Sequence, residues 1–157
     1  MIGGEIQEIK VDDVMTHLVV TFRPQDTIEE AAARLLRNRI SGAPVVEQGR
    51  LVGVVSEADI VAAYTPPASH GSVVAPDPLM FLVRGIVPRS VIRTTVGDVM
   101  TTAVISISPD AGVWEAASLI DRHGFRRLPV VDDEGYVVGV LARADLVRAL
   151  AGPRRVA

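Results

Sequence analysis

The chain has 157 residues, enough for one compact domain or two very small ones, and 48% of them are hydrophobic, which argues against global disorder. Aromatic residues make up only 4% and the net charge is −3, so a dedicated binder of duplex nucleic acid is disfavoured. The chain has no cysteine, which excludes disulfides, thiolate nucleophiles and cysteine-ligated metals. We therefore expect tightly packed α/β layers with a core of Val, Leu, Ile and Ala.

The N-terminal residues MIGGEIQEIK include acidic side chains and lack the apolar stretch of a secretory signal. No apolar run approaches the roughly 18 residues that a membrane-spanning helix needs, and the longest candidate is residues 79–83. We expect a cytoplasmic protein without a membrane span.

An internal repeat organises the chain. VDDVMT at 11–16 recurs as VGDVMT at 96–101, and PVVEQGRLVGVVSEAD at 44–59 recurs with one inserted residue as PVVDDEGYVVGVLARAD at 129–145. Agreement in register over this length predicts two copies of one supersecondary unit. We expect a first repeat with its N-terminal segment at 1–63, a Pro-rich connector at 64–93, a second repeat at 94–152 and a tail at 153–157.

The first repeat begins with β-branched and aromatic residues at 19–22, which predict a strand. The pattern Thr27-x-x-Glu30 is a capping box and begins a helix. The apolar face of this helix has the 3–4 spacing of an amphipathic helix. It comprises Ile28, Ala31, Ala32, Leu35 and Leu36.

Two short strands and a second helix follow. Residues 43–46 and 51–55 are joined by the turn sequence Gln48-Gly49, which predicts an antiparallel hairpin. Ser56 is placed to cap a helix that runs towards Tyr64. The predicted order is therefore β-α-β-β-α.

The second repeat predicts the same order. The expected elements are a strand at 104–107, a helix at 113–123, a hairpin of 128–131 and 136–141, and a last helix at 144–151. Each repeat would leave one apolar sheet face uncovered, so we expect the two to pack sheet against sheet with pseudo-twofold symmetry. Such packing would create two related clefts, and clefts of this kind often bind small ligands.

The connector contains five prolines and the apolar residues 79–83. This apolar patch either packs back on the body of the protein or forms a dimer contact. Trp114 lies on a predicted helix and is expected in the core or at an interface.

These motifs resemble a tandem pair of CBS domains, named after cystathionine β-synthase and often called a Bateman module. The resemblance rests on VDDVMT/VGDVMT, SGAPVV/RRLPVV, LVGVVS/VVGVLA and SEAD/ARAD, which occur twice in the same order. It implies an α/β (α+β) fold of two β-α-β-β-α CBS motifs that dimerises head-to-head or head-to-tail. It also implies a regulatory module without catalytic activity that binds AMP, ADP, ATP or S-adenosylmethionine and controls a partner protein.

Ser56 and Asp59 have two interpretations. A serine at the N-cap with an aspartate three residues later satisfies the free N–H groups of a helix. The same groups can bind a nucleotide, with helix N–H groups and the serine hydroxyl on phosphate and the aspartate on the ribose hydroxyls. In the second repeat Asp145 remains while Ala142 replaces the serine, so the ribose role is less secure there.

The resemblance implies two sets of ligand-binding residues, each combining both repeats. We expect the first set to bind phosphate better, because Arg126 or Arg127 could grip it while the first repeat has Ile40 and Ser41 there. The first set comprises Ser56, Asp59, Asp98, Thr102, Ala103, Phe125, Arg126 and Arg127. The second comprises Asp13, His17, Leu18, Ile40, Ser41, Arg143 and Asp145.

Three alternatives remain open. The chain could be an interaction scaffold whose clefts are vestigial, which the Ala142 departure and the apolar connector favour. It could be a nucleotide-handling enzyme related to IMP dehydrogenase, but the repeats leave no room for a catalytic barrel. Arginine content suggests nucleic-acid binding only weakly, and His17, His70 and His123 are too scattered for a metal motif.

Overall fold

The computed structural model describes residues 9–17, 19–64 and 94–152, and the chain divides into two compact units that do not coincide with the two repeats. The unit named here the β1–β2 unit comprises Thr21–Glu47 and Val52–Ala103. The β3–β4 unit comprises Met1–Val20, Gln48–Leu51 and Val104–Ala157. The N-terminal part of each repeat is therefore grouped with the hairpin of the other repeat.

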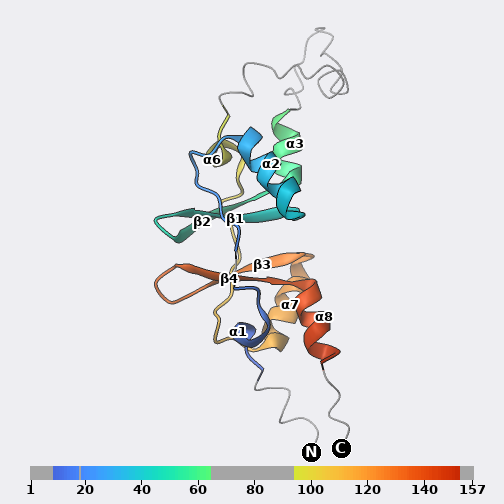
Figure 1. The fold of residues 1–157 in the computed structure, drawn as a ribbon. Helices are drawn as coiled ribbons and strands as arrows, with labels where there is room; N and C mark the ends of the chain where they lie inside the picture. Colours follow the sequence, from blue (N-terminus) through green and yellow to red (C-terminus); the bar gives the residue numbers. More distant parts are fainter. Residues whose placement is uncertain (1–8, 18, 65–93, 153–157) are drawn as a thin grey trace, which may run out of the picture. The chain divides into compact units, whose positions relative to one another are not determined.

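The β1–β2 unit places its helices on one face of a two-stranded hairpin (Figure 1). Its elements are α2 (Ile28–Asn38), β1 (Gly42–Glu47), β2 (Arg50–Ser56) from Val52 onwards, α3 (Glu57–Ala63) and α6 (Val96–Val99). The hairpin turn requires left-handed backbone, with φ of 51° at Gln48 and 82° at Gly49. The sequence therefore predicted this hairpin correctly from its turn residues.

Helix α2 begins as predicted, because the Oγ1 atom of Thr27 accepts a hydrogen bond from the N–H of Glu30 at 3.1 Å. Ile28, Ala31 and Leu35 are buried under the helix. The expectation that Leu36 shares this face is wrong, since its side chain is 74% exposed. One residue advances the helix by about 100°, which turns Leu36 away from the stripe that ends at Leu35.

The β3–β4 unit has the same scheme. Its elements are α1 (Val11–Val14), α7 (Val113–His123), β3 (Arg127–Val131), β4 (Val137–Ala142) and α8 (Arg143–Leu150). The hairpin is antiparallel and pairs Leu128 with Leu141. Helix α7 has the bounds that the sequence predicted and ends at Gly124, whose φ of 67° satisfies a left-handed C-cap. The α+β class is thus confirmed.

The strands predicted at 19–22 and 104–107 are reduced to single bridges. Phe22 pairs in parallel with Val45, and Ile107 pairs in parallel with Val130. The described part of each sheet therefore has two strands, whereas the predicted order β-α-β-β-α gave each repeat three. Phe22 exchanges main-chain hydrogen bonds with Pro44 and Val46, and Ile107 does the same with Pro129 and Val131, but these bonds are too few to make a strand.

Two corresponding segments, called here the VMT segments (residues 10–16 and 95–101), each contain a four-residue helix that the sequence did not predict. In the β1–β2 unit, α6 donates from Val96 to the carbonyl of Asp26 at 2.7 Å, and Thr101 pairs with Val54. In the β3–β4 unit the same pattern recurs, where Thr16 pairs with Val140. Hydrogen bonds to another part of the chain thus fix these short helices.

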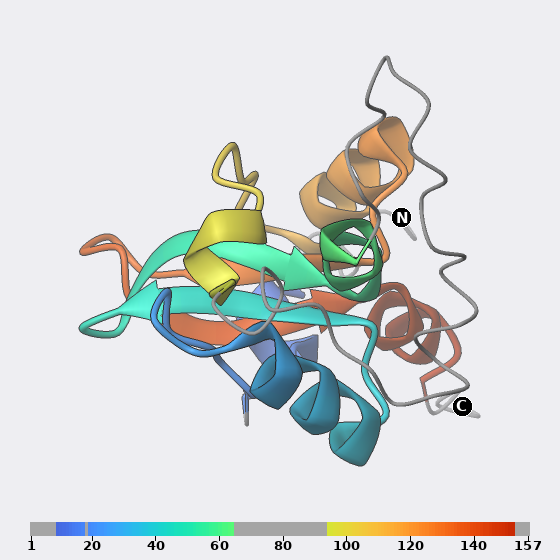
Figure 2. The ribbon, with the colours of Figure 1, turned by 90° about the horizontal axis from the view of Figure 1, so that it is seen from above.

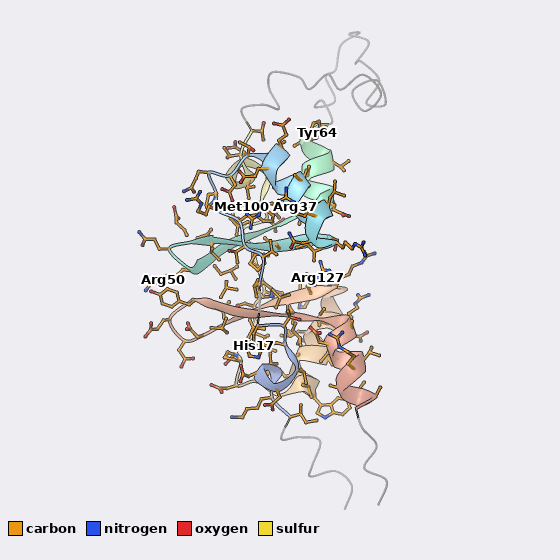
Figure 3. All side chains as sticks on the ribbon, in the orientation of Figure 1. His17, Arg37, Arg50, Tyr64, Met100 and Arg127 are labelled. Carbon is orange, nitrogen blue, oxygen red and sulfur yellow. The ribbon has the colours of Figure 1, made fainter. Side chains whose placement is uncertain are left out.

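Glycine is required where each VMT segment crosses a hairpin. A Cβ atom added at Gly53 would lie 2.7 Å from the sulfur of Met100 and 2.9 Å from the carbonyl oxygen of Thr101. A Cβ atom at Gly139 would lie 2.6 Å from the sulfur of Met15. Figure 3 labels Met100, which lies against β2. The sequence matched the two glycines to each other, and the structure supplies the reason for both.

Several expectations fall outside the described residues. They concern the connector from residue 65 to 93 with its apolar patch at 79–83 and His70, as well as Leu18 and the tail at 153–157. Among the described residues, no helix combines the length and the apolar character that crossing a bilayer demands.

Candidate functional site

Strand β2 passes directly into helix α3 (Figure 2). The junction carries Ser56 and Asp59. The N–H of Ser56 donates to Oδ2 of Asp59 at 2.9 Å, and the hydroxyl of Ser56 lies 3.0 Å from the same oxygen. The N–H of Asp59 lies 3.3 Å from Oγ of Ser56. The reciprocal capping box expected from the sequence is therefore present.

Helix α3 has little N–H capacity left for an anion. Besides the bonds of the capping box, the N–H of Glu57 donates to the carbonyl of Ser41 at 2.9 Å. Helix α3 is also only seven residues long. These contacts give no support to the phosphate role that the sequence suggested for this helix end, which stays a prediction.

The second oxygen of Asp59 is different. Among the residues that the structure describes, none donates a hydrogen bond to its Oδ1 atom, and the residue is only half-buried. An ionised carboxylate oxygen is a strong acceptor for hydroxyl donors. Asp59 therefore retains one oxygen that a ligand hydroxyl could reach without displacing a described protein group.

The corresponding junction between β4 and α8 holds Asp145 in another way. Its Oδ2 atom accepts from the N–H of Ala142 at 2.8 Å, so Asp145 caps α8 without a serine partner. Its Oδ1 atom forms an ion pair with the guanidinium of Arg148, one turn along the helix. The Asp145 side chain is only 2% exposed, whereas Arg148 is 72% exposed. Both oxygens of Asp145 thus have protein partners.

The carboxylates of the VMT segments also act as caps. Oδ2 of Asp98 accepts from the N–H of Thr95 at 2.9 Å and from its hydroxyl at 3.0 Å. The backbone hydrogen bond from Thr95, helped by its side-chain hydrogen bond and opposed by slight desolvation, lowers the pKa of Asp98 below its usual value of 3.8. Oδ2 of Asp13 accepts from the N–H of Lys10 at 3.0 Å.

The residues after these helices are exposed. Thr102 and Ala103 follow Thr101, whose main chain exchanges two hydrogen bonds of 2.9 Å with Val54. His17 is exposed beside α1, where Nε2 lies 3.2 Å from the carbonyl oxygen of Asp12 (Figure 3).

The starts of the two hairpins hold the remaining predicted residues. In the β3–β4 unit, Arg143 donates from its main-chain N–H to the carbonyl of Arg126 at 3.1 Å and from Nε to the carbonyl of Phe125 at 2.7 Å. The Phe125 ring stacks on His123 with ring centres 5.2 Å apart. Arg126 is exposed, and Arg127 begins β3.

In the β1–β2 unit, the half-buried Ile40 and Ser41 precede β1. The N–H of Ile40 donates to the carbonyl of Leu35 at 3.1 Å, and Ser41 receives the bond from Glu57 described above. Each hairpin start is thus bonded to the helix that follows the same hairpin.

The structure brings part of each predicted set together within one unit. In the first set, Ser56, Asp59, Asp98, Thr102 and Ala103 belong to the β1–β2 unit, and Phe125, Arg126 and Arg127 belong to the β3–β4 unit. In the second set, Asp13, His17, Arg143 and Asp145 belong to the β3–β4 unit, and Ile40 and Ser41 belong to the β1–β2 unit. Both sets stay predictions as binding sites.

Sequence reasoning missed Arg148. The signal was present, because Asp145 and Arg148 are three residues apart on a predicted helix, a spacing at which side chains meet. The equivalent position in the first repeat is Ala62. No group of three or more His, Cys, Asp or Glu suited to a metal ion occurs among the described residues.

Comparisons with known proteins agree with this architecture. A model of the CBS domain matches residues 11–65 and 96–152. An uncharacterised protein of Methanocaldococcus jannaschii, MJ1426, is 38% identical over 95% of this chain and 94% of its own length.

Two solved structures with bound ligands are similar to this chain. The complex of CBSX2 with AMP is 30% identical in sequence and has a TM-score of 0.70. The match covers 90% of this chain and 96% of the CBSX2 chain. CBSX2 comes from Arabidopsis thaliana. The CBS domain pair of MJ0100, in complex with 5-methylthioadenosine and S-adenosyl-L-methionine, is 26% identical with a TM-score of 0.66, over 92% of this chain and 97% of that one.

Proposed function

Because this chain belongs to the CBS domain family, we propose that it is a regulatory module without catalytic activity that binds an adenosine-containing ligand, namely AMP, ADP, ATP or S-adenosylmethionine. Two similar structures carry ligands of this class, since CBSX2 was solved in complex with AMP and the MJ0100 domain pair in complex with 5-methylthioadenosine and S-adenosyl-L-methionine. Binding would change the equilibrium between two arrangements of the protein, which a partner protein reads. The proposal keeps the cytoplasmic location expected from the sequence, which cell fractionation would test.

The observation that carries the proposal is the Oδ1 atom of Asp59. A ribose presents two neighbouring hydroxyl donors, and a carboxylate oxygen without a described protein donor can accept from them. The capping box holds the other oxygen and fixes the side chain, so the acceptor is oriented before a ligand arrives. Fixing the acceptor in advance lowers the entropic cost of binding.

Calorimetry with AMP, ADP, ATP and S-adenosylmethionine tests the proposal, and Asp59→Asn is the sharpest variant. Asparagine keeps an acceptor for the cap but removes the charge, so affinity should fall about tenfold or more. Glu57→Gln is the matched control, because Glu57 lies in the same helical turn and is exposed. Absence of heat and of any thermal shift with all four ligands at millimolar concentration would reject the proposal.

A scaffold dimer with vestigial ligand sites is the second candidate, and exposed apolar helix faces favour it. Trp114 is 51% exposed, Val147 63% and Leu150 70%. An open apolar hollow in the same unit is lined by residues that include Ile9, Val113, Trp114, Ala117, Leu146 and Leu150.

A homodimer would cover such surfaces and is compatible with either candidate function. Light scattering on the wild type and on Trp114→Ala would measure it, and the variant should dissociate at higher concentration. A tight dimer whose melting temperature no adenosine ligand changes would select the scaffold.

A further inference from the structure

The two equivalent aspartates differ in the partner of their Oδ1 atom. Asp59 and Asp145 each give Oδ2 to the backbone N–H of the residue before their helix, at 2.9 and 2.8 Å. Oδ1 of Asp145 is paired with Arg148, whereas Oδ1 of Asp59 has no donor among the described residues. This difference at Oδ1 follows one sequence difference, because the position of Arg148 is Ala62 in the first repeat.

The pair with Arg148 changes what Asp145 can offer a ligand. Only 2% of the Asp145 side chain is exposed. Arg148 is paired with Oδ1 of Asp145, which is the equivalent of the Asp59 oxygen that has no described donor. A hydroxyl donor would have to displace a charge-assisted hydrogen bond, which a neutral donor replaces poorly. Arg148 lies mostly in solvent, so its departure is possible but unfavourable.

We propose that Arg148 closes the Asp145 position to the ribose of a ligand, so that each chain takes up one adenosine ligand, at Asp59. This inference rests on the proposed function and adds to it the stoichiometry and the residue that sets it. Removing Arg148 should open a second position, and placing an arginine at residue 62 should close the first. The pair should weaken ribose binding about 10- to 100-fold, the range of a hydrogen bond to a charged group.

Four proteins test the proposal by titration calorimetry with AMP: the wild type, Arg148→Ala, Ala62→Arg and the double variant. Ala62 is exposed and three residues after Asp59, so an arginine there can form the same i,i+3 pair without disturbing the core. The expected numbers of sites per chain that escape this 10- to 100-fold weakening are about one, two, none and one, because each is counted where no arginine pairs with the aspartate. Circular dichroism and thermal unfolding check that every variant folds.

The possible outcomes separate this inference from the proposed function. Two sites in the wild type, or one site in Arg148→Ala, would overturn the closing role of Arg148 while leaving adenosine binding intact. Binding by Ala62→Arg that equals the wild type would overturn it as well, even if Arg148→Ala failed to fold. Absence of AMP binding in all four proteins would overturn the closing role and count against the proposed function together.

Discussion

The two units build the same scheme around cores whose side chains are differently sized. In the β1–β2 unit the buried positions Phe22 and Ala43 combine a large ring with a small side chain. The corresponding positions of the β3–β4 unit are Ile107 and Leu128, both also buried. A larger residue at one position accompanies a smaller one at the other, so each core is filled by its own combination. The repeats therefore share a backbone plan but cannot exchange core residues singly.

The largest expected effect breaks this size relation. Leu128→Ala should destabilise the protein by about 2–5 kcal/mol, because a fully buried leucine is removed from a core that holds only Ile107 at the compensating position. The free energy of unfolding in urea measures it. Adding Ile107→Phe recreates the combination of the other unit and should recover part of the loss. A double variant no more stable than Leu128→Ala would show that the two positions do not compensate.

The second-largest effect should be equal in the two units, because each VMT segment crosses its hairpin at a glycine. Gly53→Ala and Gly139→Ala should each cost about 1–3 kcal/mol, because the added Cβ would press on a carbonyl oxygen and a methionine sulfur. The sulfur can move, whereas the carbonyl belongs to a paired main chain. Gly112→Ala serves as a control, since no atom lies within 4 Å of a Cβ there. If either Gly53→Ala or Gly139→Ala kept the unfolding free energy of the wild type in urea, the two VMT segments would not pack on their hairpins in the same way.

A smaller effect concerns the caps of α3 and α8. Ser56→Ala should cost about 1 kcal/mol, because it removes the hydroxyl from the capping box. The reverse change Ala142→Ser should stabilise the protein by up to about 1 kcal/mol, since Asp145 is already placed to complete the box. Thermal unfolding of the two variants measures both changes in stability. Shifts of the same sign would show that the two helix starts are not equivalent.

The smallest effect is a pH dependence at α6. Hydrogen bonds from Thr95 lower the pKa of Asp98 in the folded protein below 3.8, so its contribution to stability is present above pH 3.8. This contribution is lost as the pH falls through the lower folded-state pKa, because protonation then removes the bonded carboxylate. The free energy of unfolding of Asp98→Asn should therefore decline less steeply below pH 3.8 than that of the wild type. If the unfolding free energies of the wild type and of Asp98→Asn, measured in urea, fell equally steeply below pH 3.8, this role of Asp98 would be contradicted.

Local sequence signals predicted most of the helices and both hairpins. Helix α7 follows from its apolar spacing and from Gly124, and α2 follows from Thr27 and Glu30, because these signals act within one or two turns. The sequence missed helices α1 and α6, whose four residues are held by hydrogen bonds to distant turns. A helix of four residues is not stable by itself, so no local sequence pattern predicts it.

The candidate site also has a part that local sequence predicts and a part that only the structure shows. Ser56 and Asp59 were predictable as a cap, because both partners lie within one helical turn. The pairing of Asp145 with Arg148 has the same spacing, yet nothing in the spacing alone says that one oxygen is taken and the carboxylate is buried. Burial depends on the whole unit packing around α8, and this decides how much of the charge a ligand could reach.

By itself, the sequence determined the repeat, the family resemblance, the hairpins and the longer helices, since all of these depend on residues close together in the chain. Only the tertiary structure decided that each VMT segment packs on the other repeat's hairpin, and that Gly53 and Gly139 must lack a side chain there. It also decided that Asp59 keeps an open oxygen while Asp145 does not. Contacts between residues far apart in sequence produce the first two features. The Asp145–Arg148 pair lies within one helical turn, but the burial of Asp145 depends on packing by distant parts of the unit.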